Sequence, residues 1–391
     1  MPVQKVQPSI LRKVNECRVL NAIRINKSMS RADLQRELQL TMPTISKIVD
    51  FFIEQDWIEE SGLGEFIMGR PPVMLQINKR APIAIGIEVA RREIRIVFVN
   101  LLGEIIHQDL FLLQAMTYPI QLVTYLKQIL ECKKLVEKDL IGIGFAAPGI
   151  MQDATESSNQ LSFEQLSEWV NTDIQELFER EFNVMVRMEN DANAAVLGEL
   201  WFGKSNENQH MVFVYSDVGL GAGIAVNGSL YRGMNKMAGE FGHTIVDPNS
   251  DVQCVCGRYG CVGTLSDMMH IRHRIQTIRD EKTISHEDIL HRASHGIDPE
   301  MSILKTAIRY LAVGIINLVQ TIDPAVIILG GEFLTHAYVL NGLKSQLKKM
   351  MIRKKTEVIT AGFERFSVAV GAATLILQDV FDHTQLIEQP Q

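Results

Sequence analysis

Three cysteines lie within eight residues near the middle of the chain, at Cys254, Cys256 and Cys261. The 391-residue chain has five cysteines, and its first ten residues lack the apolar core of a secretory signal, so a disulfide scaffold is not expected. Thiols clustered in this way bind metal ions in reducing compartments. The spacing therefore predicts a metal site in a cytoplasmic protein, and three unrelated reduced cysteines are the alternative.

A second group of residues suited to binding lies near the N-terminus, where Thr41, Thr44 and Lys47 are three residues apart. This spacing places their side chains on one face at the start of a helix. Hydroxyl and ammonium groups in that position suit the base edges and phosphates of a double-stranded DNA operator. Arg70, in the segment 69–72 (Gly-Arg-Pro-Pro), is a further DNA-binding candidate because arginine is favoured in narrow minor grooves. Gly and Pro also simply end strands, so this segment alone is a weak signal.

Three short helices and a hairpin are predicted to position these DNA-binding candidates. Apolar spacing predicts a helix over 9–26, a second helix capped by Ser30, and a third capped by Thr41 with Pro43 in its first turn. A strand from Trp57, a turn at 61–64 and a return strand at 73–77 follow. This order predicts a winged helix-turn-helix over residues 1–80. A small helical subdomain that mediates protein contacts is the alternative.

The charge of the chain is unevenly distributed. The net charge of −7 argues by itself against nucleic acid, but residues 1–47 carry nine Lys or Arg and only three Asp or Glu. A basic N-terminal end on an acidic body suits local contact with phosphates, although a solvated helix face gives the same composition. The composition, with 46% hydrophobic and 22% charged residues, is typical of a globular protein. No apolar run is expected to be long enough to span a membrane.

From Ala81 onward the pattern predicts an α/β domain over residues 81–391. Alternating apolar residues predict strands over 83–89, 94–98 and 105–113, then a helix over 118–132 and a strand over 140–146. A second set begins near Met211, with strands at 211–216, 221–226 and 326–329, an Asn227-Gly228 hairpin turn and a long helix through Leu311 and Val319. The order βββαβα resembles one half of an actin/hexokinase-like (ribonuclease H-like) fold, in which two such halves enclose a cleft.

Three segments make the resemblance specific: Glu-Asn-Asp-Ala-Asn-Ala at 189–194, Gly-Glu-Phe-Gly-His at 239–243, and Cys-Val-Cys-Gly-Arg-Tyr-Gly-Cys at 254–261. Their sequence and order resemble the signature segments of the ROK family (repressors, open reading frames and sugar kinases), over about residues 9–380. With the N-terminal helices and Gly69-Arg70-Pro71, the chain is similar to the repressor branch, which includes xylose and N-acetylglucosamine repressors. The resemblance implies a two-lobed ROK domain that follows a DNA-binding domain.

The resemblance implies four metal ligands, namely His243, Cys254, Cys256 and Cys261. One nitrogen and three sulfurs form a closed tetrahedral set that suits a structural Zn²⁺ ion. Gly257 and Gly260 are expected to let the loop fold back, so that Cys261 reaches the same ion.

The resemblance also implies sugar-binding residues, namely Asn190, Asp191, Glu240 and His243. In kinases of the family, the aspartate corresponding to Asp191 takes the proton from the sugar hydroxyl. A carboxylate at a helix start is also common for structural reasons, because the helix dipole stabilises it. At position 263 the family usually carries Glu, whereas this chain has Gly263, which removes a side-chain acceptor and leaves a changed ligand, or none, as alternatives.

The two phosphate loops of the family's kinases are altered in this chain. The first usually reads Asp-x-Gly-Gly-Thr, and here Glu-Val-Ala-Arg-Arg occupies 88–92 without the glycines whose amides meet ATP phosphates. The second usually reads Gly-Thr-Gly, and here Asp217-Val218-Gly219 lacks the hydroxyl and adds a negative charge. Phosphoryl transfer depends on positioning and charge neutralisation, so a domain without kinase activity is expected.

The sequence as a whole predicts a cytoplasmic, DNA-binding repressor of carbohydrate genes. We expect a homodimer or higher homo-oligomer that responds to a sugar, a sugar phosphate or a partner protein. Two alternatives remain at this point, an active ROK sugar kinase with an added DNA-binding head and a DNA-binding scaffold without a small-molecule ligand.

Overall fold

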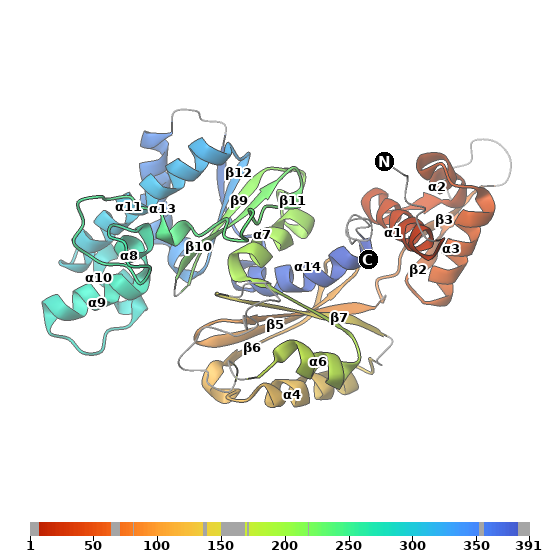
Figure 1. Ribbon diagram of the computed structural model, residues 1–391, viewed down its shortest axis with the longest axis horizontal. Helices are drawn as coiled ribbons and strands as arrows, with labels where there is room; N and C mark the ends of the chain where they lie inside the picture. Colours follow the sequence, from red (N-terminus) through yellow and green to blue (C-terminus); the bar gives the residue numbers. More distant parts are fainter. Residues whose placement is uncertain are drawn as a thin grey trace.

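The computed structural model describes residues 8–63, 71–80, 82–135, 139–149, 169, 172–217, 219–351 and 356–381. Two five-stranded sheets dominate this part of the chain (Figure 1). The first has the order β6 (Ile105–Leu112), β5 (Glu93–Asn100), β4 (Ile83–Val89), β7 (Leu140–Ala147) and β8 (Met185–Asn190). The second has the order β11 (Ser229–Leu230), β10 (Leu220–Val226), β9 (Met211–Ser216), β12 (Val326–Gly330) and β13 (Glu357–Thr360).

The two sheets have the same topology. In each, the first three strands in sequence pair antiparallel and the next two join in parallel. The predicted two-lobed fold is therefore confirmed, and we call the lobes built on the two sheets the first and second lobe. Asn227 and Gly228 have φ of +53° and +71°, as the predicted two-residue hairpin turn requires.

Helices cover both faces of the first sheet, which explains why every residue of β4 is buried. On one face, alternate β4 residues pack against α4 (Pro119–Cys132) and α6 (Ile174–Phe182). On the other face lies α14 (Ser367–Phe381), which also packs against α7 (Asp191–Phe202) between the two sheets (Figure 1). A Cβ atom at Gly144 of β7 would overlap the carbonyl of Ala372, so glycine lets α14 lie directly on the sheet.

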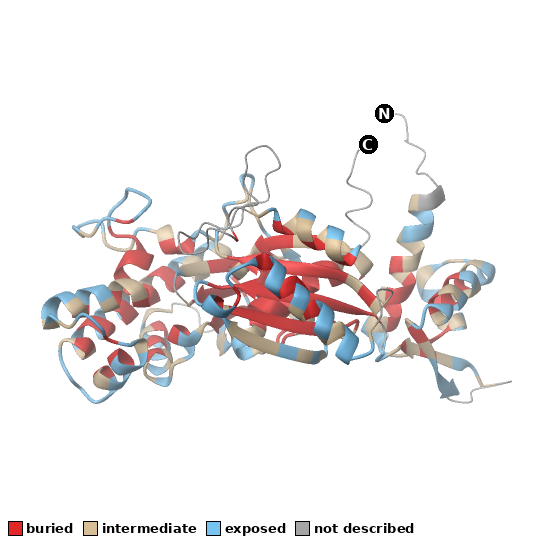
Figure 2. Ribbon diagram, turned by 90° about the horizontal axis from the view of Figure 1, so that it is seen from below, coloured by how far each residue is buried: buried red, intermediate tan, exposed pale blue. Residues whose placement is uncertain are grey.

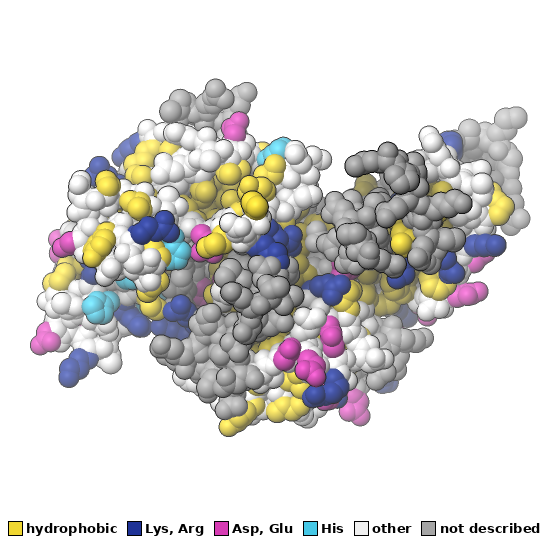
Figure 3. Space-filling view, in the orientation of Figure 1, with side chains coloured by type: hydrophobic (Ala, Val, Ile, Leu, Met, Phe, Trp, Pro, Cys, Tyr) yellow, Lys and Arg dark blue, Asp and Glu magenta, His cyan; other side chains and the backbone are white. Residues whose placement is uncertain are grey.

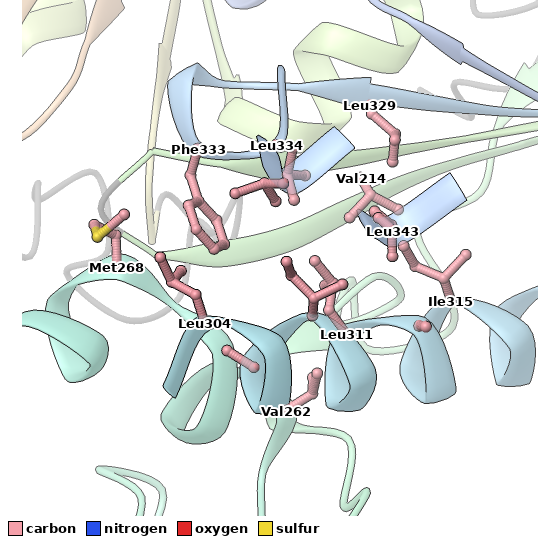
Figure 4. Packing of buried hydrophobic residues seen from close by; sticks show 14 of the residues in the cluster. Val214, Val262, Met268, Leu304, Leu311, Ile315, Leu329, Phe333, Leu334 and Leu343 are labelled. Atoms are coloured by element: carbon pink, nitrogen blue, oxygen red, sulfur yellow. The ribbon is translucent and has the colours of Figure 1, made fainter. Parts of the chain in front are cut away.

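The core of the second lobe forms between its sheet and α11 (Glu300–Ile322). Figure 4 shows Leu304, Leu311 and Ile315 of α11 pointing toward Val214 and Leu329 of the sheet. Further helices contribute to this core, namely α8 (Val262–Ser266), α9 (Met268–Arg279), α10 (His286–Ser294), α12 (Glu332–Thr335) and α13 (Ala337–Met350). By length and composition α11 could span a membrane, so the expectation that no apolar run is long enough was wrong for this helix. Its packing in the core accounts for the apolar residues.

The N-terminal unit, residues 8–80, contains the three predicted helices, α1 (Pro8–Asn26), α2 (Arg31–Leu38) and α3 (Met42–Glu54). Ser30 caps α2 in a reciprocal pair with Asp33, and the Thr41 side chain accepts a hydrogen bond from the Thr44 amide. Strands β2 (Ile58–Leu63) and β3 (Val73–Ile77) pair antiparallel. The predicted turn at 61–64 was misplaced, because residues 61–63 still belong to β2, and Gly62 and Leu63 pair with β3 beyond a bulge. The sequence also gave no sign of β1 (Met29–Ser30), which pairs with β3.

The core of the N-terminal unit continues into the first lobe. One cluster of buried residues joins Val19 of α1 and Leu75 of β3 to Val97 and Val99 of β5 and to Phe381 of α14. In Figure 2, buried residues are concentrated in the central sheets and extend toward this unit. The two parts of the chain are therefore in direct apolar contact across the predicted boundary at residues 80 and 81.

Candidate functional site

The four predicted metal ligands converge in the second lobe. One nitrogen or sulfur atom from each of His243, Cys254, Cys256 and Cys261 lies within 4.8 Å of the others. The Cys256 and Cys261 sulfurs are 3.7 Å apart, and His243 Nδ1 is 3.4 Å from the Cys254 sulfur. A tetrahedral ion with Zn–S bonds of about 2.3 Å separates its sulfurs by roughly 3.8 Å. The donors are thus already spaced as such an ion requires, and all five cysteines of the chain are free thiols.

Short local contacts build this metal-binding loop. Isolated β-bridges join Ile245 to Cys261 and Gln253 to Tyr259, so the chain returns on itself. Gly257 and Gly260, with φ of +83° and +72°, make that return, as expected from the sequence. A hydrogen bond from the Arg258 backbone amide lowers the pKa of Cys256 to about 6, whereas burial raises the pKa of Cys261 to about 12. A cation is therefore needed to hold the buried sulfur as a thiolate.

A cavity of about 270 Å³, the central cavity, opens between the lobes near the carboxyl ends of β4, β8 and β9. This is the position in which open α/β sheets bind their ligands. All four predicted sugar-binding residues line it, namely Asn190, Asp191, Glu240 and His243. Its size is near the lower end of the range for small-molecule sites.

Asn190 and Asp191 lie where β8 passes into α7. The Asn190 side-chain oxygen accepts hydrogen bonds from the amides of Ala192 and Asn193, at 3.0 and 3.2 Å, so Asn190 caps the helix as well as lining the cavity. Burial raises the pKa of Asp191 to about 7, and the negative charges of Glu88, Asp217 and Glu240 add to the shift. Asp191 is therefore able to accept or to donate a hydrogen bond near neutral pH.

His243 faces both the metal ligands and the central cavity. Its Nδ1 points to the Cys254 sulfur, while its Nε2 is 3.9 Å from Glu240 Oε2. A histidine that binds metal through one nitrogen keeps the other for a hydrogen bond, and that bond fixes the ring. The two roles predicted for His243 are therefore compatible in one side chain.

The sequence reasoning missed an ion pair beside Asp191. Arg232, in the loop after β11, contacts Glu189 Oε2 through Nε and Nη2 at 2.9 and 2.6 Å, and Asn193 donates to Glu189 Oε1 at 3.1 Å. Both Arg232 and Glu189 line the central cavity. The pair ties the loop of the second lobe to the end of β8 in the first lobe. The family segment at 189–194 contains Glu189, but no sequence signal indicates its partner 43 residues away.

Gly263, the departure from the family pattern, lies in the buried helix α8. A Cβ atom there would stand 3.0 Å from the carbonyl oxygen of Gly242, so a side chain at this position would require that carbonyl to move by a few tenths of an ångström. Gly263 is not among the residues that line the central cavity. Of the second altered loop, Val218 lies outside the described residues.

The DNA-binding candidates occupy the start of α3. Thr41 and Lys47 are exposed and Thr44 is half-buried, whereas Ile45, Ile48 and Val49 of the same helix are buried. The Thr41 and Thr44 hydroxyls are 2.8 Å apart. The fourth candidate, Arg70, lies outside the described residues.

Several of the nine N-terminal basic residues are engaged within the protein. Arg31 pairs with Asp50 and Arg36 with Asp33, both at 2.7 Å, and Arg18 donates to the Leu38 carbonyl. Arg24 stacks on the rings of Trp201 and Phe381 at 4.6 and 5.1 Å. Figure 3 shows basic and acidic side chains next to one another at this end of the molecule. The count of basic residues therefore overstated the charge that is available to DNA.

A family model described as the ROK family matches residues 84–379. The xylose repressor of Bacillus spizizenii is 28% identical over 381 residues, which cover 96% of this chain and 97% of that protein. Among solved structures, a ROK family transcriptional regulator, described as a homologue of the Escherichia coli MLC protein, superposes with a TM-score of 0.76 at 24% identity, covering 97% of this chain and 98% of that one. A ROK family glucokinase from Streptomyces griseus, in complex with glucose and AMPPNP, gives a TM-score of 0.61 at 22% identity, covering 75% and 98%.

The glucokinase match covers three quarters of this chain, and the regulator match covers nearly all of it. The family match includes both lobes, the metal-binding loop and the central cavity. This chain belongs to the ROK family.

Proposed function

We propose that this protein is a sugar-responsive transcriptional repressor of carbohydrate uptake or catabolism genes. The observation that carries the proposal is the start of α3, where Thr41, Thr44 and Lys47 reach the surface. The N-terminal unit that carries them shares a buried core with the first lobe, whose β4 and β8 help to line the central cavity. The xylose repressor that matches this chain over 96% of its length supports the same function. As a regulator of this type the protein acts in the cytoplasm, on double-stranded operator DNA.

The N-terminal unit acts as a winged helix-turn-helix in this proposal. Helix α3 enters the major groove as the recognition helix, α2 crosses the backbone, and the β2–β3 hairpin forms the wing. Arg70, which lies between these strands in sequence, is proposed to contact the minor groove. Residues 1–80 form the DNA-binding domain and residues 81–391 the effector and dimerisation domain. In a homodimer, two such units read half-sites about 34 Å apart or a multiple of it.

The effector is proposed to be a sugar or sugar phosphate held by Asn190, Asp191, Glu240 and His243 in the central cavity. The xylose repressor relative makes D-xylose the first compound to test, within a panel of sugars and their 6-phosphates. A ligand at one hundred times its Kd stabilises the native state by about 2.7 kcal/mol, so its binding raises Tm. A panel in which no compound raises Tm would favour a partner protein as the effector.

The metal is proposed to be a structural Zn²⁺ held by His243, Cys254, Cys256 and Cys261. Since His243 also faces the central cavity, the ion fixes the ring that presents Nε2 to the sugar. The zinc has no part in catalysis, because all four of its coordination positions are taken by the protein.

Lys47→Ala is expected to weaken DNA binding about tenfold and to reduce the slope of log K against log salt by about 1, if its ammonium meets a phosphate. Lys344→Ala, which alters an exposed lysine on α13, is the matched control and should leave both quantities unchanged. Gel shifts over a range of salt concentrations measure both. If Lys47→Ala changes neither the salt slope nor the preference among DNA sequences, Lys47 does not contact DNA.

We further propose that the ROK domain has no kinase activity, and expect no release of ADP above background with Mg²⁺, ATP and any sugar of the panel. The altered loop at 88–92 lacks the glycines that let backbone amides approach ATP phosphates, and the loop at 217–219 lacks the hydroxyl and adds a negative charge. Asp191, which lines the cavity with a pKa of about 7, is the observation that favours the alternative of an active kinase. A coupled assay of ADP release decides between an inactive domain and an active kinase. Turnover by the wild-type protein that disappears in the Asp191→Asn variant would establish kinase activity.

A further inference from the structure

A second cavity, of about 490 Å³, lies beside the central cavity. Its lining includes Gly331, Glu332, Thr360 and Arg365 of the second lobe, together with Arg95 of the first lobe. Tyr215 and Asp217 line both cavities. The two cavities therefore adjoin at Tyr215 and Asp217.

Arg95 lines the second cavity beside these two residues, and only 3% of its surface is exposed. Its Nη1 lies 2.8 Å from Glu88 Oε1 and 3.3 Å from the Tyr215 hydroxyl. Its Nη2 lies 2.9 Å from Glu93 Oε2 and 3.4 Å from Asp217 Oδ2. The Tyr215 hydroxyl in turn donates to Glu88 Oε1 at 2.8 Å. One guanidinium thus binds three carboxylates and a phenol.

These contacts cross between the lobes. Glu88 and Arg95 belong to β4 and β5 of the first sheet, whereas Tyr215 belongs to β9 of the second sheet and Asp217 directly follows that strand. The β4–β5 and β9–β10 turns are the two that carry the altered phosphate loops. Arg95 therefore lies where the two hairpins meet, between the two altered loops.

The charge balance explains why the guanidinium is stable there. Glu88 is 1% exposed, and burial raises its pKa, while the neighbouring carboxylates raise the pKa of Arg95 above its ordinary value. Arginine stays charged in such surroundings, and its planar fork serves several acceptors at once. Removing either partner of a buried pair leaves an uncompensated charge, so the network resists separation of its parts.

We propose that Arg95 is an interlobe latch that holds the β4–β5 and β9–β10 hairpins together and closes the central cavity off from the second cavity. A group bound in the second cavity has no path to a hydroxyl in the central cavity while the latch is closed. The lobes cannot open at this edge without unpairing a buried arginine, so the latch fixes the shape of the sugar cavity. The latch is independent of DNA binding and of the identity of the effector.

The test is hydrogen exchange, followed by mass spectrometry, in the full chain and its Arg95→Met variant. Peptides that cover 88–95 and 211–222 are both expected to exchange about tenfold faster in the variant, because charged hydrogen bonds to both hairpins are lost. Arg279→Met is the matched control. Arg279 pairs with the buried Glu300 inside the second lobe, so its loss should leave both hairpins unchanged. Faster exchange in 88–95 alone would overturn the proposal, because Arg95 would then serve only its own lobe.

Asp217→Asn supplies a second test that does not require Arg95→Met to fold. Asp217 is partly exposed and contacts Arg95 from the other lobe at 3.4 Å. The latch predicts faster exchange in 88–95, although the substitution lies on the opposite lobe. Exchange in 88–95 that equals the wild-type rate would contradict the proposal.

Discussion

Replacing Cys256 with serine is expected to abolish stoichiometric metal binding and to destabilise the second lobe by about 3 kcal/mol or more. Cys256 is one of four donors within 4.8 Å of one another, and a structural zinc site contributes its binding free energy directly to folding. A serine hydroxyl does not ionise near neutral pH, so the tetrahedral set would lose a ligand. The loss should also free the His243 ring, and sugar binding should weaken with it.

Metal content by elemental analysis and unfolding in urea measure the two effects. Cys132→Ser is the matched control, since Cys132 is an exposed thiol on α4 that is remote in sequence from the ligand set. This control should retain one zinc per chain and wild-type stability within about 0.5 kcal/mol. Freshly purified wild-type protein without stoichiometric metal would refute the zinc proposal, whatever the stability of the variant.

The double variant Thr44→Glu, Lys47→Glu is expected to lower specific DNA affinity at least about 1,000-fold, to the level of non-specific binding. Two carboxylates at the start of α3 would face the phosphates, and repulsion there would oppose docking of the recognition helix. The fold should be unaffected, because both positions lie outside the buried face of α3 and acidic residues suit a helix N-terminus.

This substitution is a cleaner test than deletion of residues 1–80. Deletion would expose residues of β5 and α14 that are now buried against α1 and β3, and lost binding could then reflect misfolding. Lys344→Glu on α13 is the control, because it makes the same lysine-to-glutamate change at a position remote in sequence from α3. This variant should leave DNA affinity unchanged. Gel shifts that show specific binding by the double variant at wild-type affinity would exclude α3 as the recognition helix.

Most elements of the fold could be predicted from local signals. Ser30 and Thr41 cap helices because their side chains satisfy amides in the first turn, and the signal lies within three residues. Strand β1 could not be predicted, because two residues have no period and form a strand only by pairing with β3. The turn at 61–64 was misplaced for a similar reason, since a bulge lets Gly62 stay in the strand.

The metal ligands could be predicted because residue type and close spacing specify their chemistry. Arg95 and Arg232 could not, because the partners that they contact on the other lobe lie 43 to 122 residues away in sequence. The number of basic residues near the N-terminus overstated the charge available to DNA for the same reason, because the partners of these residues are set by packing. Composition does not reveal that Arg24 stacks on Trp201, a residue brought close only by packing of the two parts of the chain.

The most direct test of the proposed function is selection of binding sites from random double-stranded DNA by the full-length protein. The proposal predicts enrichment of an inverted repeat whose half-sites are separated by about one helical turn, or a multiple of it, since two α3 helices of a homodimer must reach the major groove. The Thr44→Glu, Lys47→Glu variant should enrich nothing. Failure of the wild-type protein to enrich any sequence beyond that variant would contradict the proposal that this ROK protein is a DNA-binding repressor.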